Sequence, residues 1–364
     1  MKRSHVFTVL KLVIAAGLIA WVISAAGWDN IKNALSNIDR QGWVNGLGLV
    51  LLANCLSMFR WHILMRSVGL HSTPWIAIRL GFIGVFFSNV VPGLTGGDLV
   101  KAIYVTRENP DQRASAVVSV IVDRIVGIVA LALIAAVVIP FDLALYGEAA
   151  IGIFGFLGAA GLGATFALSR RAKAWLRRVL ARFGRKDGEA GAPSMLSKID
   201  QAVSMYRDRL GLLAGALFMS FAVHLLIICA LFLFGNAMAD GGEAALLADP
   251  SFVAADTTVE QELGELQALA DVPLVGYCSI IPIIMIISAL PIAPAGWGVG
   301  EAMFVYFFST VGVAGNLAAA LSLTYRITVL LVSLIGGIML VLDRKRVMEA
   351  ASEESAEEAG GGVA

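Results

Sequence analysis

Charged residues are scarce in this sequence: they make up 15% of its 364 residues, whereas hydrophobic types make up 58%. A soluble globular domain carries about 25% charged residues. The composition therefore excludes an ordinary soluble protein and indicates an integral membrane protein, for which we expect the plasma membrane or a cell inner membrane as its location. The formal net charge is zero, and we expect no nucleic-acid partner.

Cysteine and histidine are also rare, and neither shows the spacing of a metal site. Cys55, Cys229 and Cys278 lie in apolar segments without a CxxC pair, so we interpret them as small buried hydrophobic residues. The four histidines are scattered, with no HExxH motif and no i,i+4 pair, which argues against a metal site. We expect no cofactor, no metal and no set of catalytic residues.

Long apolar runs are what the sequence has in abundance. About 20 apolar residues cross a bilayer as a helix. We expect full spans at about 6–27, 42–60, 115–140, 149–168, 211–236 and 315–342. We interpret the first as a retained span rather than a cleaved signal peptide, because its apolar run starts at Val6 and only Lys11 interrupts it. These runs predict an all-α, polytopic membrane bundle, in which residues 1–342 form a single transmembrane domain.

The distribution of Lys and Arg predicts the orientation of the spans. Basic residues gather at the N-terminus, in segment 169–209 and directly after the last span. All three regions, and hence both termini, are expected in the cytoplasm. We interpret 169–209 as a basic amphipathic linker on the membrane surface and 343–364 as a disordered tail. Segment 237–272 contains eight acidic residues and no Lys or Arg, so we expect an acidic external loop there.

Two further apolar regions, 76–106 and 273–312, are interrupted by Pro and Gly. The order of the spans requires the first region to begin and end in the cytoplasm. Its two arms, of about 12–14 and 9–10 residues, are too short to cross ~30 Å of hydrocarbon at ~1.5 Å per residue. We therefore expect a re-entrant helical hairpin. The same argument predicts a second hairpin from outside, although its first arm, 273–290, is long enough to span.

The two halves of the chain then share one order of elements in opposite orientations, which predicts an inverted repeat of about 6–140 and 149–342. The stretches VVPGLTGGDLVKAIYV and APAGWGVGEAMFVYF both place Pro, Gly and an acid before an apolar arm. Arg124 follows Asp98 by 26 residues, and Arg326 follows Glu301 by 25. Hairpins could look alike simply because they need Pro and Gly, but that explanation does not account for the matched arginines.

The interrupted helices predict a polar site near the centre of the membrane. Non-helical backbone at that depth is tolerated only where it is buried in protein or lines a cavity, and paired interruptions mark the binding sites of transporters. A restarting helix offers free N–H groups to an anion such as phosphate. The candidate binding residues are Arg60, Asn89, Gly96, Gly97, Asp98, Lys101, Asp123, Arg124, Gly298, Gly300, Glu301 and Arg326.

Arg124 and Arg326 lie in the middle of expected spans. A charge there costs ~2.5–3.5 kcal/mol on insertion scales, so we expect both arginines to face the hairpin tips, with Asp98, Asp123 and Glu301 as the nearest candidate partners. Two roles are open for each of Asp98 and Glu301. Each either satisfies N–H groups where its helix starts, or pairs with an arginine or a headgroup.

Alternative roles are also open for Arg60, Lys101 and Asn89. Arg60 stands at the expected end of its span, where snorkelling to the surface is the commonest role of an arginine. Lys101 either snorkels or receives an anionic headgroup beside the entrance. Asn89 is expected to satisfy the broken backbone rather than to bind a ligand.

These residues resemble the lysylphosphatidylglycerol synthase transmembrane region, also called the flippase-like domain family. The matching segments are RW at 60–61, FFSNVVPGLTGGDLVKA at 86–102, VDRIVGIVAL at 122–131, LPIAPAGWGVGEA at 290–302 and YRITVLLVSLIGGIML at 325–340. The resemblance implies a lipid translocase or lipid-handling module. In bifunctional members a cytosolic aminoacyl-transferase domain follows. This chain stops about 20 residues after its last expected span, so aminoacyl-lipid synthesis is not expected of it.

The expected function is therefore the movement of a lipid between leaflets. The expected partners are membrane lipids with an anionic headgroup, either a phospholipid or a polyprenyl phosphate. An ion-coupled transporter of a small polar solute and a lipid-modifying membrane enzyme stay open as alternatives. A lateral groove would favour a lipid, and a closed central cavity would favour a solute. A second copy of the chain and a separate lipid-modifying enzyme are left open as protein partners.

Overall fold

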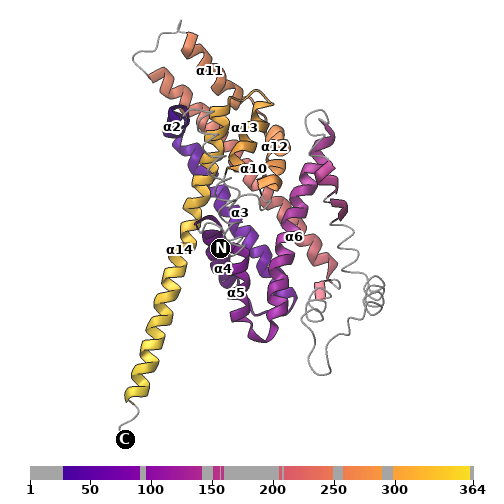
Figure 1. The fold of residues 1–364 in the computed structure, drawn as a ribbon, viewed down its shortest axis with the longest axis vertical. Coiled ribbons are helices and arrows are strands. Elements are labelled where there is room, and N and C mark those ends of the chain that lie inside the picture. Colours follow the sequence, from indigo (N-terminus) through magenta and orange to yellow (C-terminus); the bar gives the residue numbers. More distant parts are fainter. Residues whose placement is uncertain are drawn as a thin grey trace, which may run out of the picture.

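The computed structural model describes residues 28–90, 96–141, 151–155, 157–159, 205–206, 209–248, 257–288 and 298–360. These residues form helices and connecting turns and contain no β-strand, as the sequence predicts (Figure 1). The main helices are α2 (Trp28–Ser36), α3 (Arg40–Ser67), α4 (Pro74–Val90), α5 (Gly96–Glu108), α6 (Arg113–Val138), α10 (Leu210–Ala248), α11 (Thr257–Ala270), α12 (Leu274–Ser288), α13 (Val299–Ser309) and α14 (Gly315–Gly360). The 3-10 turns η1 (Pro110–Gln112) and η2 (Ile139–Phe141) flank α6.

Four stretches in the described part are long and apolar enough to cross a membrane. They are α3, Pro110–Val138, α10 and Gly315–Leu342, and they coincide with predicted spans. The pair Val259–Ala270 and Leu274–Ser288, bent by 81°, is a further candidate. The protein is thus a multi-pass membrane protein. The predicted span 6–27 lies outside the described residues, as do most of 149–168 and of the linker 169–209.

The two interrupted regions form two pairs of short helices. Helices α4 and α5 pack against each other, and so do α12 and α13. The longest of the four, α4, has 17 residues and spans about 26 Å, so each helix, as far as it is described, is shorter than ~30 Å of hydrocarbon. The described part of the arm 273–290 is α12, which has 15 residues up to Ser288, and residues 289–290 lie outside the described part of the chain. Figure 1 shows α4 and α5 in the lower half of the bundle and α12 and α13 in the upper half.

Each hairpin packs against a long helix from the other half of the chain. Helix α4 lies along α14, and α12 lies against α6, while α3 and α10 pack side by side. Small residues allow these close contacts, as is usual between helices in membranes. A side chain at Gly336 of α14 would collide with the backbone of Phe82 in α4, and one at Gly46 of α3 would collide with Phe234 of α10. The inverted repeat stays a prediction, and this exchange of partners is the packing that it leads us to expect.

Helix α3 extends beyond the expected end of its span at residue 60. It continues to Ser67, and Gly69 then adopts a φ of 79°. The amide of Leu70 donates to the carbonyl of Met65, and that of Gly69 donates to Arg66. This glycine-centred C-terminal cap ends the helix. Because the cap and not the first basic residue sets the boundary, Arg60 lies two turns inside the helix.

Helices extend beyond the expected spans into both acidic segments. Helix α10 runs on to Ala248 and α11 follows, so the described part of the segment 237–272 is mostly helical, and its external location stays a prediction. Glycines allow this extension to pack, because a side chain at Gly241 would meet the backbone of Asn37, and one at Gly242 would meet Leu266 of α11. Helix α14 likewise continues to Gly360, which differs from the expected disorder over residues 343–360, and the last four residues lie outside the described part of the chain. Both segments are rich in Ala and Glu, which are strong helix formers.

Candidate functional site

The broken ends of both hairpins meet at one cavity of about 420 Å³. Asn89 and Ser288 contribute from the last turns of α4 and α12, and Asp98 and Gly300 from the first turns of α5 and α13. Helices α3, α6, α10 and α14 complete the wall. Of the twelve predicted residues, eight line the cavity: Arg60, Asn89, Asp98, Lys101, Asp123, Arg124, Gly300 and Arg326. The structure therefore brings together residues that the sequence scatters over more than 260 positions.

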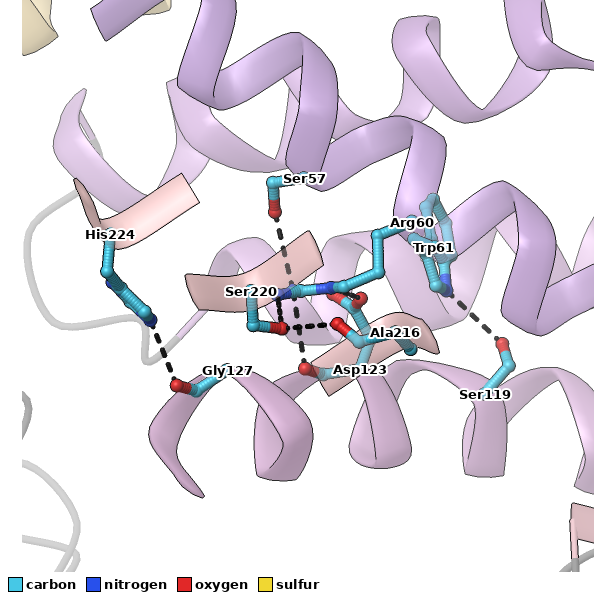
Figure 2. Close-up of polar contacts among 9 residues, drawn as sticks. All are labelled: Ser57, Arg60, Trp61, Ser119, Asp123, Gly127, Ala216, Ser220 and His224. Atoms are coloured by element: carbon cyan, nitrogen blue, oxygen red, sulfur yellow. Dashed lines mark hydrogen bonds and ion pairs between the residues drawn. The ribbon is translucent and has the colours of Figure 1, made fainter. Parts of the chain in front are cut away.

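Arg60 is held in a buried polar cluster between three helices (Figure 2). It is 4% exposed, and its Nε atom lies 2.8 Å from Oδ1 of Asp123. Its Nη1 atom donates to Oγ of Ser220 at 2.6 Å, and Nη2 lies 3.4 Å from Oγ of Ser57. The interpretation of Arg60 as a snorkelling residue is therefore wrong. Asp123 pairs with this arginine and not with Arg124 or Arg326.

The other two arginines each pair with the acid that precedes them by 25 or 26 residues. Nε of Arg326 lies 2.7 Å from Oε1 of Glu301. The second carboxylate oxygen of Glu301 accepts a hydrogen bond from the amide of Gly298 at 2.7 Å. Glu301 thus fills both expected roles, since it satisfies the start of α13 and neutralises an arginine. Nη1 of Arg124 lies 3.7 Å from Oδ2 of Asp98.

The two ion pairs differ in their surroundings. The side chains of Glu301 and Arg326 are 2% and 14% exposed, whereas those of Asp98 and Arg124 are 43% and 56% exposed. The cavity is therefore closed beside α13 and α14 and open beside α5 and α6. Ile121 and Ile125, next to Arg124 on α6, are exposed as well, so this open side coincides with an apolar outer face of the bundle.

Lys101 of α5 supplies a positive charge that no carboxylate balances within the described ranges. Its Nζ atom lies 5.5 Å from the centre of the Trp61 ring, a cation–π contact. Trp61 is buried, and its indole nitrogen donates to Ser119 at 3.3 Å, which fixes the ring. Among the described residues, four cations meet three carboxylates around the cavity, which leaves one net positive charge. An anion is the ligand that such a site favours.

Three predicted glycines do not line the cavity but shape the helix ends and their packing, and Asn89 bonds to the backbone as well as lining the cavity. Gly96 starts α5, and Gly298, with a φ of 79°, caps α13. Gly97 lies against α4, where a side chain would collide with Ser88 and with the backbone of Gly84, so its small size serves packing rather than ligand approach. Asn89 donates to the carbonyl of Val85 at 2.8 Å.

The packing at Gly97 gives a stability prediction. The Gly97→Ala variant is expected to lose about 1–3 kcal/mol, because the new methyl group would push against backbone atoms that cannot rotate away. The apparent melting temperature in detergent measures the loss. Gly48→Ala is the matched control: that glycine is also helical, is exposed and has no atom within 4 Å of an added Cβ. Equal melting temperatures for the two variants would contradict the tight packing of α4 on α5.

Sequence reasoning missed three polar residues that line the cavity, Ser57, His224 and Ser288, and also Ser220, which binds Arg60. Ser220 and His224 stand four residues apart in an otherwise apolar span, and therefore on one face of α10. Polar residues within a span generally face the interior of the bundle, and that signal could have found both of them. Nε2 of His224 lies 2.9 Å from the carbonyl of Gly127 in α6. In the described part of the chain, no three side chains come together that could hold a metal ion.

Known proteins resemble this chain over most of its length. The family described as "Lysylphosphatidylglycerol synthase TM region" matches residues 8–248. A UPF0104 membrane protein of Methanothermobacter thermautotrophicus is 23% identical over 333 residues, which cover 87% of this chain and 90% of that protein. A UPF0104 membrane protein of Pyrococcus horikoshii is 27% identical over 124 residues, or 32% of this chain and 36% of that protein.

Proposed function

This chain belongs to the lysylphosphatidylglycerol synthase transmembrane-region family, and on that premise we propose that it moves a lipid with an anionic headgroup between the two leaflets of a cell membrane. The observation that carries the proposal is the cavity at which the ends of both hairpins meet, with one net positive charge. A transporter binds its substrate at such interrupted helices. The unbalanced Lys101 gives an anionic group a reason to enter.

The shape and lining of the cavity support a lipid over a small solute. Its polar residues lie beside apolar ones that include Ile128, Leu131 and Phe304. Its volume suits a headgroup, since ligand sites of about 300–1,000 Å³ are typical. The open side between Asp98 and Arg124 adjoins the exposed apolar face of α6. A headgroup could occupy the cavity while its acyl chains stay in the bilayer.

The orientation is part of the proposal. The clusters of basic residues support cytoplasmic N- and C-termini in a plasma or inner membrane. Hairpin α4–α5 would then enter from the cytoplasmic side, and hairpin α12–α13 would enter from the opposite side. Their placement in opposite halves of the bundle agrees with this arrangement.

Leaflet exchange in reconstituted liposomes tests the proposal. Fluorescent phosphatidylglycerol and phosphatidylcholine are placed in both leaflets, and dithionite is added to quench the outer one. We expect wild-type protein to make inner-leaflet phosphatidylglycerol accessible, and phosphatidylcholine more slowly, because it carries no net charge. Protein-free liposomes give the baseline. Absence of exchange for phosphatidylglycerol and for a polyprenyl phosphate alike would refute the proposal.

A further inference from the structure

His224 lines the cavity, and the hydrogen bond made by one of its ring nitrogens fixes the role of the other. Its Nε2 atom lies 2.9 Å from the carbonyl oxygen of Gly127 (Figure 2). A carbonyl oxygen only accepts hydrogen bonds, so Nε2 must carry the proton of the ring. In neutral histidine the other nitrogen, Nδ1, is then an acceptor with a free lone pair.

That acceptor has no partner within the described residues. His224 is 9% exposed and lines the cavity, and its Nδ1 atom is buried without a hydrogen bond. Ser288 of α12 lines the same cavity, and its Oγ atom is also buried and unpartnered. Buried polar atoms without partners destabilise a protein. Two of them on different helices around one cavity indicate hydrogen bonds that a ligand completes.

The charges around His224 favour its neutral form as a hydrogen-bond acceptor. Arg60 of α3 and Asp123 of α6 line the same cavity as His224, and they already neutralise each other at 2.8 Å. A second proton on His224 would add an unbalanced charge to a buried cluster, which is costly. The group that meets Nδ1 must therefore be a donor.

The net charge of the site distinguishes between the two common donors of lipid headgroups. An ammonium group would enter a cavity that already carries one excess positive charge, and the two would repel each other. A hydroxyl group is neutral and avoids this cost. A single negative charge on the same headgroup balances Lys101, and a phosphodiester carries one such charge.

We propose that the cavity selects a phosphodiester headgroup that bears a hydroxyl, and that His224 is the residue that recognises this hydroxyl through Nδ1. The inference rests on the proposed function and adds the chemical class of the headgroup. The phosphate lies toward Lys101. The hydroxyl donates to Nδ1 of His224, and Oγ of Ser288 offers a second hydrogen bond on the α12 side of the cavity.

Two lipid probes of equal charge test this inference in liposomes containing the full chain. Phosphatidylglycerol and phosphatidylmethanol are both singly charged phosphodiesters, but only the first has headgroup hydroxyls. We expect wild-type protein to exchange phosphatidylglycerol about tenfold faster, the difference that one hydrogen bond makes when its loss leaves a buried acceptor unpaired.

Two variants assign the preference to Nδ1. In His224→Gln the side-chain amide can still donate to Gly127 while the Nδ1 acceptor is gone, so the rate for phosphatidylglycerol should fall to that for phosphatidylmethanol. In His224→Asn the side-chain oxygen can take the place of Nδ1, so part of the preference should return. Exchange of phosphatidylmethanol should change little in either variant.

The outcomes separate this inference from the proposed function. Equal exchange of the two lipids by wild-type protein would overturn the role of His224 and leave lipid transport standing. A preference that survives in His224→Gln would also overturn that role. If neither lipid exchanges, and wild-type protein does not retain phosphatidylglycerol in native mass spectrometry, both proposals fail. The wild-type comparison decides the matter even if a variant does not fold.

Discussion

Replacing Asp123 by alanine should destabilise the protein by about 3–5 kcal/mol, the loss observed when one partner of a buried ion pair is removed. Arg60 would keep its charge at 4% exposure, with only neutral partners such as Ser220 and Ser57. Thermal unfolding in detergent measures this loss. We expect a marked fall in the melting temperature of Asp123→Ala.

Two controls separate charge from packing. In the double variant Arg60→Met with Asp123→Leu, both charges are absent, and most of the stability should return. Asp98→Ala removes the acid of the exposed pair with Arg124, whose charged atoms are 3.7 Å apart. Such a pair contributes about 0–1 kcal/mol. If Asp123→Ala is no less stable than Asp98→Ala, the polar cluster around Arg60 is not what holds α3 to α6.

Lys101→Gln is expected to slow the exchange of anionic lipid by about 10- to 100-fold. A hydrogen bond to a charged group contributes about 1.5–3 kcal/mol, and each 1.4 kcal/mol corresponds to about a factor of ten. The variant also leaves the cavity without excess positive charge. Lys101→Arg should keep most of the rate. Exchange of fluorescent phosphatidylglycerol in liposomes is the measurement.

Arg107→Gln is the matched control for that experiment. Arg107 lies on the same helix as Lys101 and also faces an aromatic ring, that of Tyr104 at 5.9 Å, but it is exposed and does not line the cavity. Its replacement should leave the rate within about twofold, since a screened surface charge has little effect. Equal slowing by both variants would point to the overall surface charge and away from a site at Lys101.

The matched spacing made Asp98 and Glu301, together with Asp123, candidate partners of Arg124 and Arg326, and the structure pairs Asp98 with Arg124 and Glu301 with Arg326. Each acid starts the second arm of a hairpin, and each arginine lies in the helix that follows. The pair of Arg60 and Asp123 could not be found in this way. Its members lie 63 positions apart on separate long helices, and only the packing of α3 on α6 brings them together.

Errors in helix length came from equating the end of an apolar run with the end of a helix. In α3 the helix continues to Ser67, seven residues after Arg60, and ends just before Gly69, which takes up a positive φ. In α10 and α14 it continues into acidic sequence, because Ala and Glu favour helix without being apolar. The span boundary and the helix boundary are separate properties, and hydropathy reports only the first.

The unequal settings of the two carboxylate–arginine pairs have a consequence for movement. If the predicted repeat holds, the two pairs occupy related positions. The Glu301–Arg326 pair is buried and 2.7 Å long, whereas the Asp98–Arg124 pair is exposed and 3.7 Å long. A rearrangement that buried the Asp98–Arg124 pair and exposed the Glu301–Arg326 pair would again leave one carboxylate–arginine pair buried and one exposed. The two forms would then differ little in free energy, as a substrate-driven equilibrium requires. One amino-acid sequence would thus encode both an inward-facing and an outward-facing shape with the same set of side chains.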